Sequence, residues 1–96
     1  MPDCLVVDDS RVVRRVARGM LERLGFMVRE AADGAEALRA CRAGRPDLIL
    51  LDRNMPVMDG LECLHALRRD FGEACPPVMF CTTEAALPRI MEALEA

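Results

Sequence analysis

The chain has 96 residues, of which 52% are hydrophobic and 30% are charged, and its formal net charge is −3. This length fits one globular domain, and because no apolar run could cross a bilayer or serve as a signal peptide, we expect a cytoplasmic protein without a membrane partner. An acidic chain with 3 phenylalanines as its aromatic residues lacks the basic stripe and stacking platforms of nucleic-acid-binding proteins.

Short apolar runs alternate with amphipathic segments along the whole chain. Short apolar runs bounded by turn residues predict strands, of which the one at 27–31 is weaker and has a polar edge, and apolar residues at spacings of three and four predict helices. The expected elements, in chain order, are a strand at 4–7, a helix between Ser10 and Gly25, a strand at 27–31, a helix between Gly34 and Gly44, a strand ending at Asp52, a helix from Leu61 to Phe71, a strand at 78–81 and a helix at 87–96.

The central strand is the most informative segment. Its core, residues 48–51, is apolar at consecutive positions, which is typical of a parallel strand covered on both faces, and it ends abruptly in Asp52. The loop beyond it contains Asp59 and Gly60, which we interpret as a turn in which glycine takes a positive φ. The first strand likewise ends in acids, Asp8 and Asp9.

Strands and helices alternate four times, which predicts an α/β fold, a doubly wound parallel sheet with right-handed crossovers and helices on both faces. In such sheets ligands gather outside the carboxyl ends of the strands, so Asp8, Asp9, Asp52 and Thr82 should share one crevice. Carboxylates packed this closely repel one another unless a hard cation neutralises them, and an oxygen-only site of this kind suits Mg²⁺. Asp8 and Asp9 alone would equally fit an ordinary helix cap, and it is Asp52 that favours the metal site.

Three segments together resemble a known family: VVDDS at 6–10, LLDRNMPVMDG at 50–60 and CTTEA at 81–85. They resemble the receiver domains of bacterial two-component response regulators, especially the single-domain chemotaxis regulators. The resemblance implies a flavodoxin-like sheet in the order 2-1-3-4 for the four strands present. It also implies one receiver domain over residues 1–96, incomplete at its carboxyl end.

Site roles follow from the same resemblance. It implies that Asp52 is the phosphoryl acceptor, Asp9 a direct Mg²⁺ ligand, Asp8 a ligand acting largely through water, and Asn54 a ligand through its backbone carbonyl. Thr82 would be the switch hydroxyl.

Two further positions have a role in the resembling family but could also be ordinary loop residues. Asn54 and Glu84 lie two residues beyond Asp52 and Thr82. In the resembling family these positions modulate how fast the phosphoryl group is hydrolysed, although both could be plain loop residues. His65, the single histidine, is expected at a solvated or half-buried helix position.

The chain departs from the family pattern at its end and in its basic residues. The family continues with a fifth strand that carries a lysine and a reorienting aromatic residue, whereas this sequence stops at Ala96 and contains no lysine. We therefore expect a weak switch, an exposed edge at Val78–Cys81, poorer packing of Leu87–Ala96, and a homodimer through that edge.

Two functions of different classes remain. The first is a receiver module that accepts a phosphoryl group on Asp52 from a sensor histidine kinase or phosphotransfer protein and acts on an unknown downstream target. The alternative is a receiver-like protein-interaction or dimerisation module that no longer switches. A hydrolase with an aspartyl-phosphate intermediate is disfavoured, because its general acid should stand where the chain has Asn54.

Overall fold

A computed structural model describes residues 1–53, 55, 58–81 and 84–95. Four strands alternate with four α-helices, and two short 3₁₀ turns, η1 and η2, complete the described part of the chain. The elements are β1 (Asp3–Val7), α1 (Arg11–Arg23), β2 (Met27–Ala31), α2 (Gly34–Ala43), β3 (Leu48–Asp52), α3 (Gly60–Phe71), η1 (Gly72–Ala74), β4 (Val78–Cys81), η2 (Glu84–Ala86) and α4 (Leu87–Glu95).

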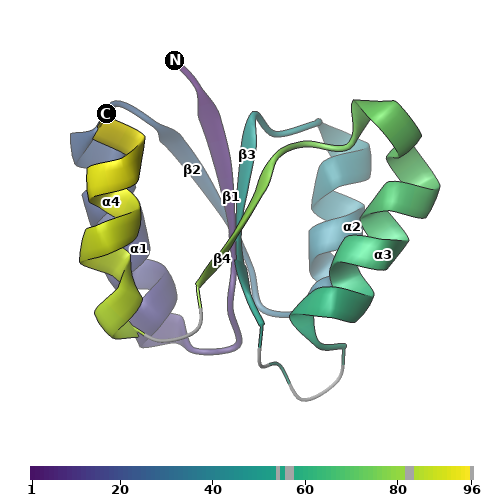
Figure 1. The fold of residues 1–96 in the computed structure, drawn as a ribbon, viewed down its shortest axis with the longest axis horizontal. Helices are drawn as coiled ribbons and strands as arrows, with labels where there is room; N and C mark the ends of the chain where they lie inside the picture. Colours follow the sequence, from purple (N-terminus) through teal and green to yellow (C-terminus); the bar gives the residue numbers. More distant parts are fainter. Residues whose placement is uncertain (54, 56–57, 82–83, 96) are drawn as a thin grey trace.

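The strands form one parallel sheet in the order β2-β1-β3-β4. Helices cover both faces, with α1 and α4 on one side and α2 and α3 on the other (Figure 1). The fold class and strand order expected from the sequence are therefore confirmed. Within the described residues, no helix is both long and apolar enough to cross a membrane.

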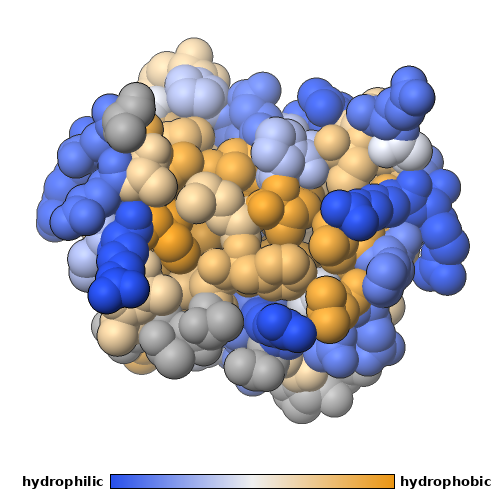
Figure 2. Space-filling view, in the orientation of Figure 1, coloured by the Kyte–Doolittle hydropathy of each residue, from blue (hydrophilic) through white to orange (hydrophobic). Residues whose placement is uncertain are grey.

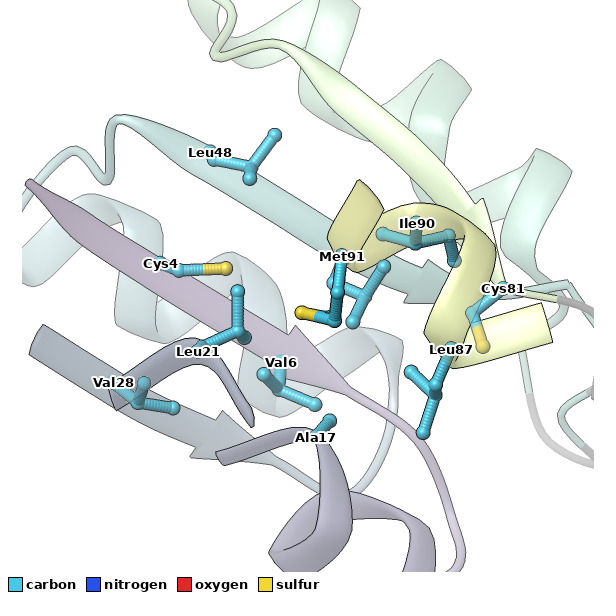
Figure 3. Packing of buried hydrophobic residues seen from close by; sticks show 11 residues of the cluster. Cys4, Val6, Ala17, Leu21, Val28, Leu48, Cys81, Leu87, Ile90 and Met91 are labelled. Atoms are coloured by element: carbon cyan, nitrogen blue, oxygen red, sulfur yellow. The ribbon is translucent and has the colours of Figure 1, made fainter. Parts of the chain in front are cut away.

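The core between the sheet and the α1/α4 layer corrects one expectation. Helix α4 was expected to lose packing, yet Leu87 is fully buried and Ile90 and Met91 are 8% and 9% exposed. The reason is that α4 lies beside α1 over the sheet, where its apolar side chains join those of α1 and the strands (Figure 3). This cluster contains Cys4, Val6, Ala17, Leu21, Val28, Leu48, Leu50, Cys81, Leu87, Ile90 and Met91.

The opposite face of the sheet packs against α2 and α3. Ile49 and Leu51 of β3 point to this side, where Cys41 of α2 and Cys63 and Leu67 of α3 are buried with them. Because consecutive β3 residues enter opposite clusters, the unbroken apolar run of this strand is explained by burial on both faces.

Helix boundaries follow the capping residues. Ser10, Asp33 and Asp59 each accept a hydrogen bond from a backbone N–H in the first turn of α1, α2 and α3. Gly25 ends α1 with φ of 93°, as its sequence position indicated. The expected positive φ at Gly60 is wrong, because Gly25 and Gly72 are the positive-φ glycines of the described residues and Gly60 is instead the first residue of α3.

Strand β4 lies at one edge of the sheet, as expected, and faces the viewer in Figure 1. Its first three residues, Val78 to Phe80, are half-buried. The space-filling view of this face shows apolar side chains across its middle, with hydrophilic side chains at both flanks (Figure 2). In the described part of the chain, the edge of the sheet formed by β4 therefore coincides with an apolar surface.

Candidate functional site

Three carboxylates meet at the carboxyl end of the central strands. Asp52 is the last residue of β3, and Asp8 and Asp9 directly follow β1. One oxygen from each of the three lies within 4.8 Å of the others. Asp8 and Asp52 are 7% and 8% exposed, whereas Asp9 is exposed. The structure thus brings together the three acids that the sequence placed in one crevice.

The pocket is electrostatically strained at Asp8. The pKa of Asp8 is raised from 3.8 to about 6, mainly because the carboxyl is buried away from water and also because the negative charges of Asp52 and Asp9 lie close to it. The hydrogen bond from the Ser10 N–H acts in the opposite direction. A positive ion among these carboxylates would offset both the cost of burying a negative charge and the repulsion between the carboxylates.

Neighbouring side chains and backbone groups fix the position of Asp8. Its N–H donates to the Ala31 carbonyl at 3.1 Å, and its Oδ1 accepts from the Ser10 N–H at 2.8 Å. Arg14 of α1 donates through Nη1 to the Asp8 carbonyl at 2.7 Å and through Nε to Glu30 of β2 at 3.1 Å. Arg14 therefore fastens the end of β1 to the neighbouring strand.

Asp52 is positioned from another side. The paired register of β1 and β3 ends at Val7 and Leu51, whereas Asp52 remains in register with Cys81 of β4. The first residue of α3, Gly60, closes the loop from β3 by donating its N–H to the Arg53 carbonyl at 2.9 Å. Strand β4 and the start of α3 therefore hold the end of β3.

The donor set of the pocket fits a hard divalent cation. All three candidate ligands are carboxylates, and two of them are buried. Oxygen donors of this kind are preferred by Mg²⁺ and Ca²⁺. The raised pKa of Asp8 indicates that burial and the neighbouring acids disfavour the ionised form of this carboxyl in the metal-free pocket. These three residues could therefore hold a metal ion.

The remaining site predictions fall in less described parts of the chain. Asn54 and Thr82 lie outside the described residues. Glu84 begins η2, and its side chain is not described. His65 is exposed on α3, in agreement with the solvated position expected for it.

Three residues beside the site were missed from the sequence. Arg14 lay on the polar face of a predicted helix, and nothing in its spacing distinguishes it from the other arginines. Asp59-Gly60 resembles an ordinary turn, yet Asp59 caps α3 and Gly60 packs against the end of β3. The run of acid, glycine and then an apolar helical pattern was the available signal, because it is typical of a helix start.

A doubly wound sheet in the order β2-β1-β3-β4 with an acidic pocket at its carboxyl edge defines a flavodoxin-like α/β domain with a candidate cation site. Residues 4–96 match the response regulator receiver domain, and the chain belongs to this family. Receiver domains are typically phosphoacceptors and not enzymes.

Two curated relatives illustrate the family. The chain is 40% identical over 93 residues to chemotaxis protein CheY of Pseudomonas aeruginosa, covering 96% of this chain and 75% of that protein. It is 42% identical over 94 residues to protein-glutamate methylesterase/protein-glutamine glutaminase 3 of Hahella chejuensis, covering 97% of this chain and 26% of that protein. The chain thus spans about a quarter of the second relative.

Solved structures agree with the fold. The chemotaxis response regulator CheY4 of Vibrio cholerae matches with a TM-score of 0.78 at 34% identity, covering 100% of this chain and 82% of that one. The response regulator TrrA of Thermotoga maritima, solved in complex with Mg(2+)-BeF, matches with a TM-score of 0.73 at 31% identity, covering 83% of this chain and 66% of that one.

Proposed function

We propose that this protein is a receiver module of two-component phosphorelay signalling that accepts a phosphoryl group on Asp52 in a Mg²⁺-dependent reaction. The observation that carries the proposal is the convergence of Asp8, Asp9 and Asp52 at the carboxyl edge of the sheet. Family membership over residues 4–96 supports it.

The three carboxylates would have different roles in phosphoryl transfer. Asp52 offers a carboxylate oxygen to the phosphorus atom, so that a P–O bond forms while the donor's own bond to phosphorus breaks. Asp8 and Asp9 hold the cation, Asp9 directly and Asp8 largely through water. Bound Mg²⁺ supplies charge neutralisation for the phosphoryl oxygens. A Mg²⁺ complex of a relative at 31% identity supports the choice of metal.

Roles for three further residues come from the family resemblance. Asn54 would add its backbone carbonyl to the metal shell. Thr82 would bind the phosphoryl group as the switch hydroxyl, and Asn54 and Glu84 would set the rate of its hydrolysis. These assignments remain proposals.

The proposed donor is a sensor histidine kinase or a phosphotransfer protein. Relatives of this chain include both a chemotaxis protein and a methylesterase, so similar receiver sequences occur in proteins with different outputs. The downstream target is therefore not assigned. The cytoplasmic location and the absence of direct contact with nucleic acid or membrane remain predictions.

A second candidate function is a receiver-like interaction module that pairs with another copy and no longer switches. The observation that favours it is the apolar surface at the open edge of β4 (Figure 2). Unpaired backbone groups at a sheet edge are a template for another strand, so two copies could join their β4 strands. Such a protein would dimerise without accepting a phosphoryl group.

Intact mass spectrometry after incubation with acetyl phosphate separates the two candidates. We expect one added phosphoryl group in the presence of MgCl₂ and none when EDTA is added. Asp52→Asn should abolish the addition. Asp33→Asn is the matched control, since asparagine still caps a helix, and it should behave like the unmodified protein. Failure of the unmodified protein to gain mass would reject the receiver function and favour the interaction module.

A further inference from the structure

Gly60 stands at the contact between the start of α3 and the end of β3. It is buried, and its N–H donates to the Arg53 carbonyl at 2.9 Å. The φ angle gives no reason for a glycine here, because Gly60 is not among the positive-φ residues. The reason lies in what surrounds its Cα.

A Cβ at position 60 would lie 2.7 Å from the Asp52 carbonyl oxygen, 2.7 Å from the Arg53 Cα and 3.0 Å from Cε1 of Phe80. The first two atoms belong to the backbone and cannot move by a side-chain rotation. Any side chain at this position must therefore displace either the start of α3 or the peptide that follows Asp52.

The peptide between Asp52 and Arg53 matters because Asp52 is the third carboxylate of the acidic pocket. The paired register of β1 with β3 reaches Val7 and Leu51, and Asp8 and Asp9 directly follow β1. Strand β4 pairs with Asp52 through Cys81, and Gly60 contacts the same peptide unit from α3. A shift of the start of α3 would therefore move the Asp52–Arg53 peptide and change the direction of the Asp52 carboxylate.

Phe80 completes the contact from the third side. It is paired in register with Leu51, and its side chain packs with the cluster between the sheet and the α2/α3 layer. The ring edge borders the space in which a Gly60 side chain would lie. Phe80 thus links β4 to the start of α3 directly beside Asp52.

We propose that Gly60 is a positioning residue of the acidic pocket, which with Phe80 seats α3 against the Asp52–Arg53 peptide and so fixes the Asp52 carboxylate relative to Asp8 and Asp9. The inference rests on the proposed function for its effect on phosphoryl transfer. Its structural part, the placement of Asp52 beside Asp8 and Asp9, can be tested without any phosphodonor.

Gly60→Ala tests the proposal, and Gly34→Ala is the matched control. Both glycines are buried first residues of helices that follow an aspartate cap. The three atoms nearest to a Cβ at Gly34 all belong to the Met58 side chain, and the nearest two, its sulfur and its Cγ, can move away by rotation about χ1. Alanine therefore has the same effect on helix propensity at both positions but forces a backbone shift at Gly60.

We expect Gly60→Ala to slow phosphoryl uptake from acetyl phosphate about tenfold at saturating MgCl₂, since small misplacements of a reacting group are costly. The rate of phosphoryl uptake by Gly34→Ala should stay within about twofold of that of the unmodified protein, because this substitution does not displace Asp52. In metal-free protein, the carboxyl ¹³C resonances of Asp8 and Asp9 should shift in Gly60→Ala and not in Gly34→Ala. A folded Gly60→Ala with unchanged uptake and unchanged carboxyl resonances overturns the proposal.

Phe80→Leu keeps the test decisive if Gly60→Ala does not fold. It removes the ring edge without forcing an atom onto the backbone, and we expect about threefold slower uptake with the same two carboxyl resonances shifted. If folded Phe80→Leu takes up the phosphoryl group as fast as the unmodified protein and its carboxyl resonances do not shift, the proposal is overturned. If the unmodified protein takes up no phosphoryl group, the proposed function fails, whereas the carboxyl resonances still decide whether Gly60 positions Asp52.

Discussion

Asp8 is the residue at which the acidic pocket opposes folding. Burial and the neighbouring acids raise its pKa from 3.8 to about 6, so the folded protein binds a proton more tightly than the unfolded chain. Below pH 4 both states are protonated at Asp8 and the pocket has no such penalty. Above pH 6 the folded state carries the ionised group and the full penalty is present, so this contribution to stability falls as the pH rises between these values.

Replacing Asp8 by asparagine should therefore stabilise the metal-free protein. Asp8→Asn retains an oxygen that can accept from the Ser10 N–H and removes the charge, so the free energy of unfolding at pH 7.5 should increase by about 2 kcal/mol. Urea denaturation in EDTA at pH 4.5, 6 and 7.5 measures it, and the gain should shrink toward pH 4.5. Equal stability of Asp8→Asn and the unmodified protein at all three values would contradict the raised pKa.

Magnesium binding should show the opposite pH dependence. A cation must compete with the proton on Asp8, so the affinity should fall about tenfold per pH unit below pH 6 and level off above it. Calorimetric titration at several pH values measures this slope. The same titration on Asp52→Asn should give markedly weaker binding, and an unchanged affinity would show that Asp52 is not a ligand.

At the scale of secondary-structure elements, Arg29 of β2 links three of them. Its Nη2 donates to Asp3 of β1 at 2.8 Å and to the Gly44 carbonyl at 2.7 Å, and its Nη1 donates to the Ala40 carbonyl at 2.9 Å. The last two acceptors lie at the carboxyl end of α2, where a cation is favoured by the helix dipole. One planar guanidinium thus joins two strands to a helix end.

Arg29→Lys should destabilise the fold although it preserves the charge. A lysine ammonium cannot reproduce the forked geometry, so we expect a loss of about 1–2 kcal/mol in the free energy of unfolding. Arg39→Lys, at an exposed position of α2, is the matched control and should change stability little. Comparable urea midpoints for the two variants would show that the fork is unimportant.

The sequence predicted those features that depend on the pattern of apolar and polar residues within a single strand. Residues 48–51 are apolar at consecutive positions because both faces of β3 are covered, and Asp52 was therefore recognised at the strand end. Asp8 and Asp9 were found by the same argument. Local patterns were enough here because the parallel alternation of strands and helices places these strand ends together.

Other features depend on contacts between distant segments. The sequence predicted the helix α4 but expected it to pack poorly, and it did not reveal that α4 would be buried beside α1. The importance of Gly60 depends on the approach of Asp52, Arg53 and Phe80. Neither relation is encoded in the spacing of residues within one element, so a single sequence could not reveal it.

At the scale of the whole molecule, the open edge of β4 predicts self-association. The Ile49 N–H donates to the Pro77 carbonyl at 2.9 Å, so in a parallel ladder the next residue, Val78, directs its N–H and carbonyl away from β3. With the apolar surface over this edge (Figure 2), we expect a two-fold dimer that pairs the β4 strands antiparallel.

Light scattering behind size exclusion over a wide concentration range measures the oligomeric state. Val78→Pro should favour the monomer, because proline removes the outward donor and is tolerated where the N–H faces away from the sheet. Val12→Ser, which removes a 64% exposed apolar side chain from α1, should leave the dimer intact. The dimer would be ruled out if the unmodified protein were monomeric at every concentration and its Val78 and Phe80 amides exchanged slowly.

The central claim is that the acidic pocket makes Asp52 a phosphoryl acceptor, and chemical trapping tests it most directly. The protein is incubated with acetyl phosphate and MgCl₂, the acyl phosphate is reduced with borohydride, and the peptides are sequenced by mass spectrometry. The account predicts homoserine at position 52, and none when MgCl₂ is replaced by EDTA. Homoserine at another aspartate, or at none, would contradict it.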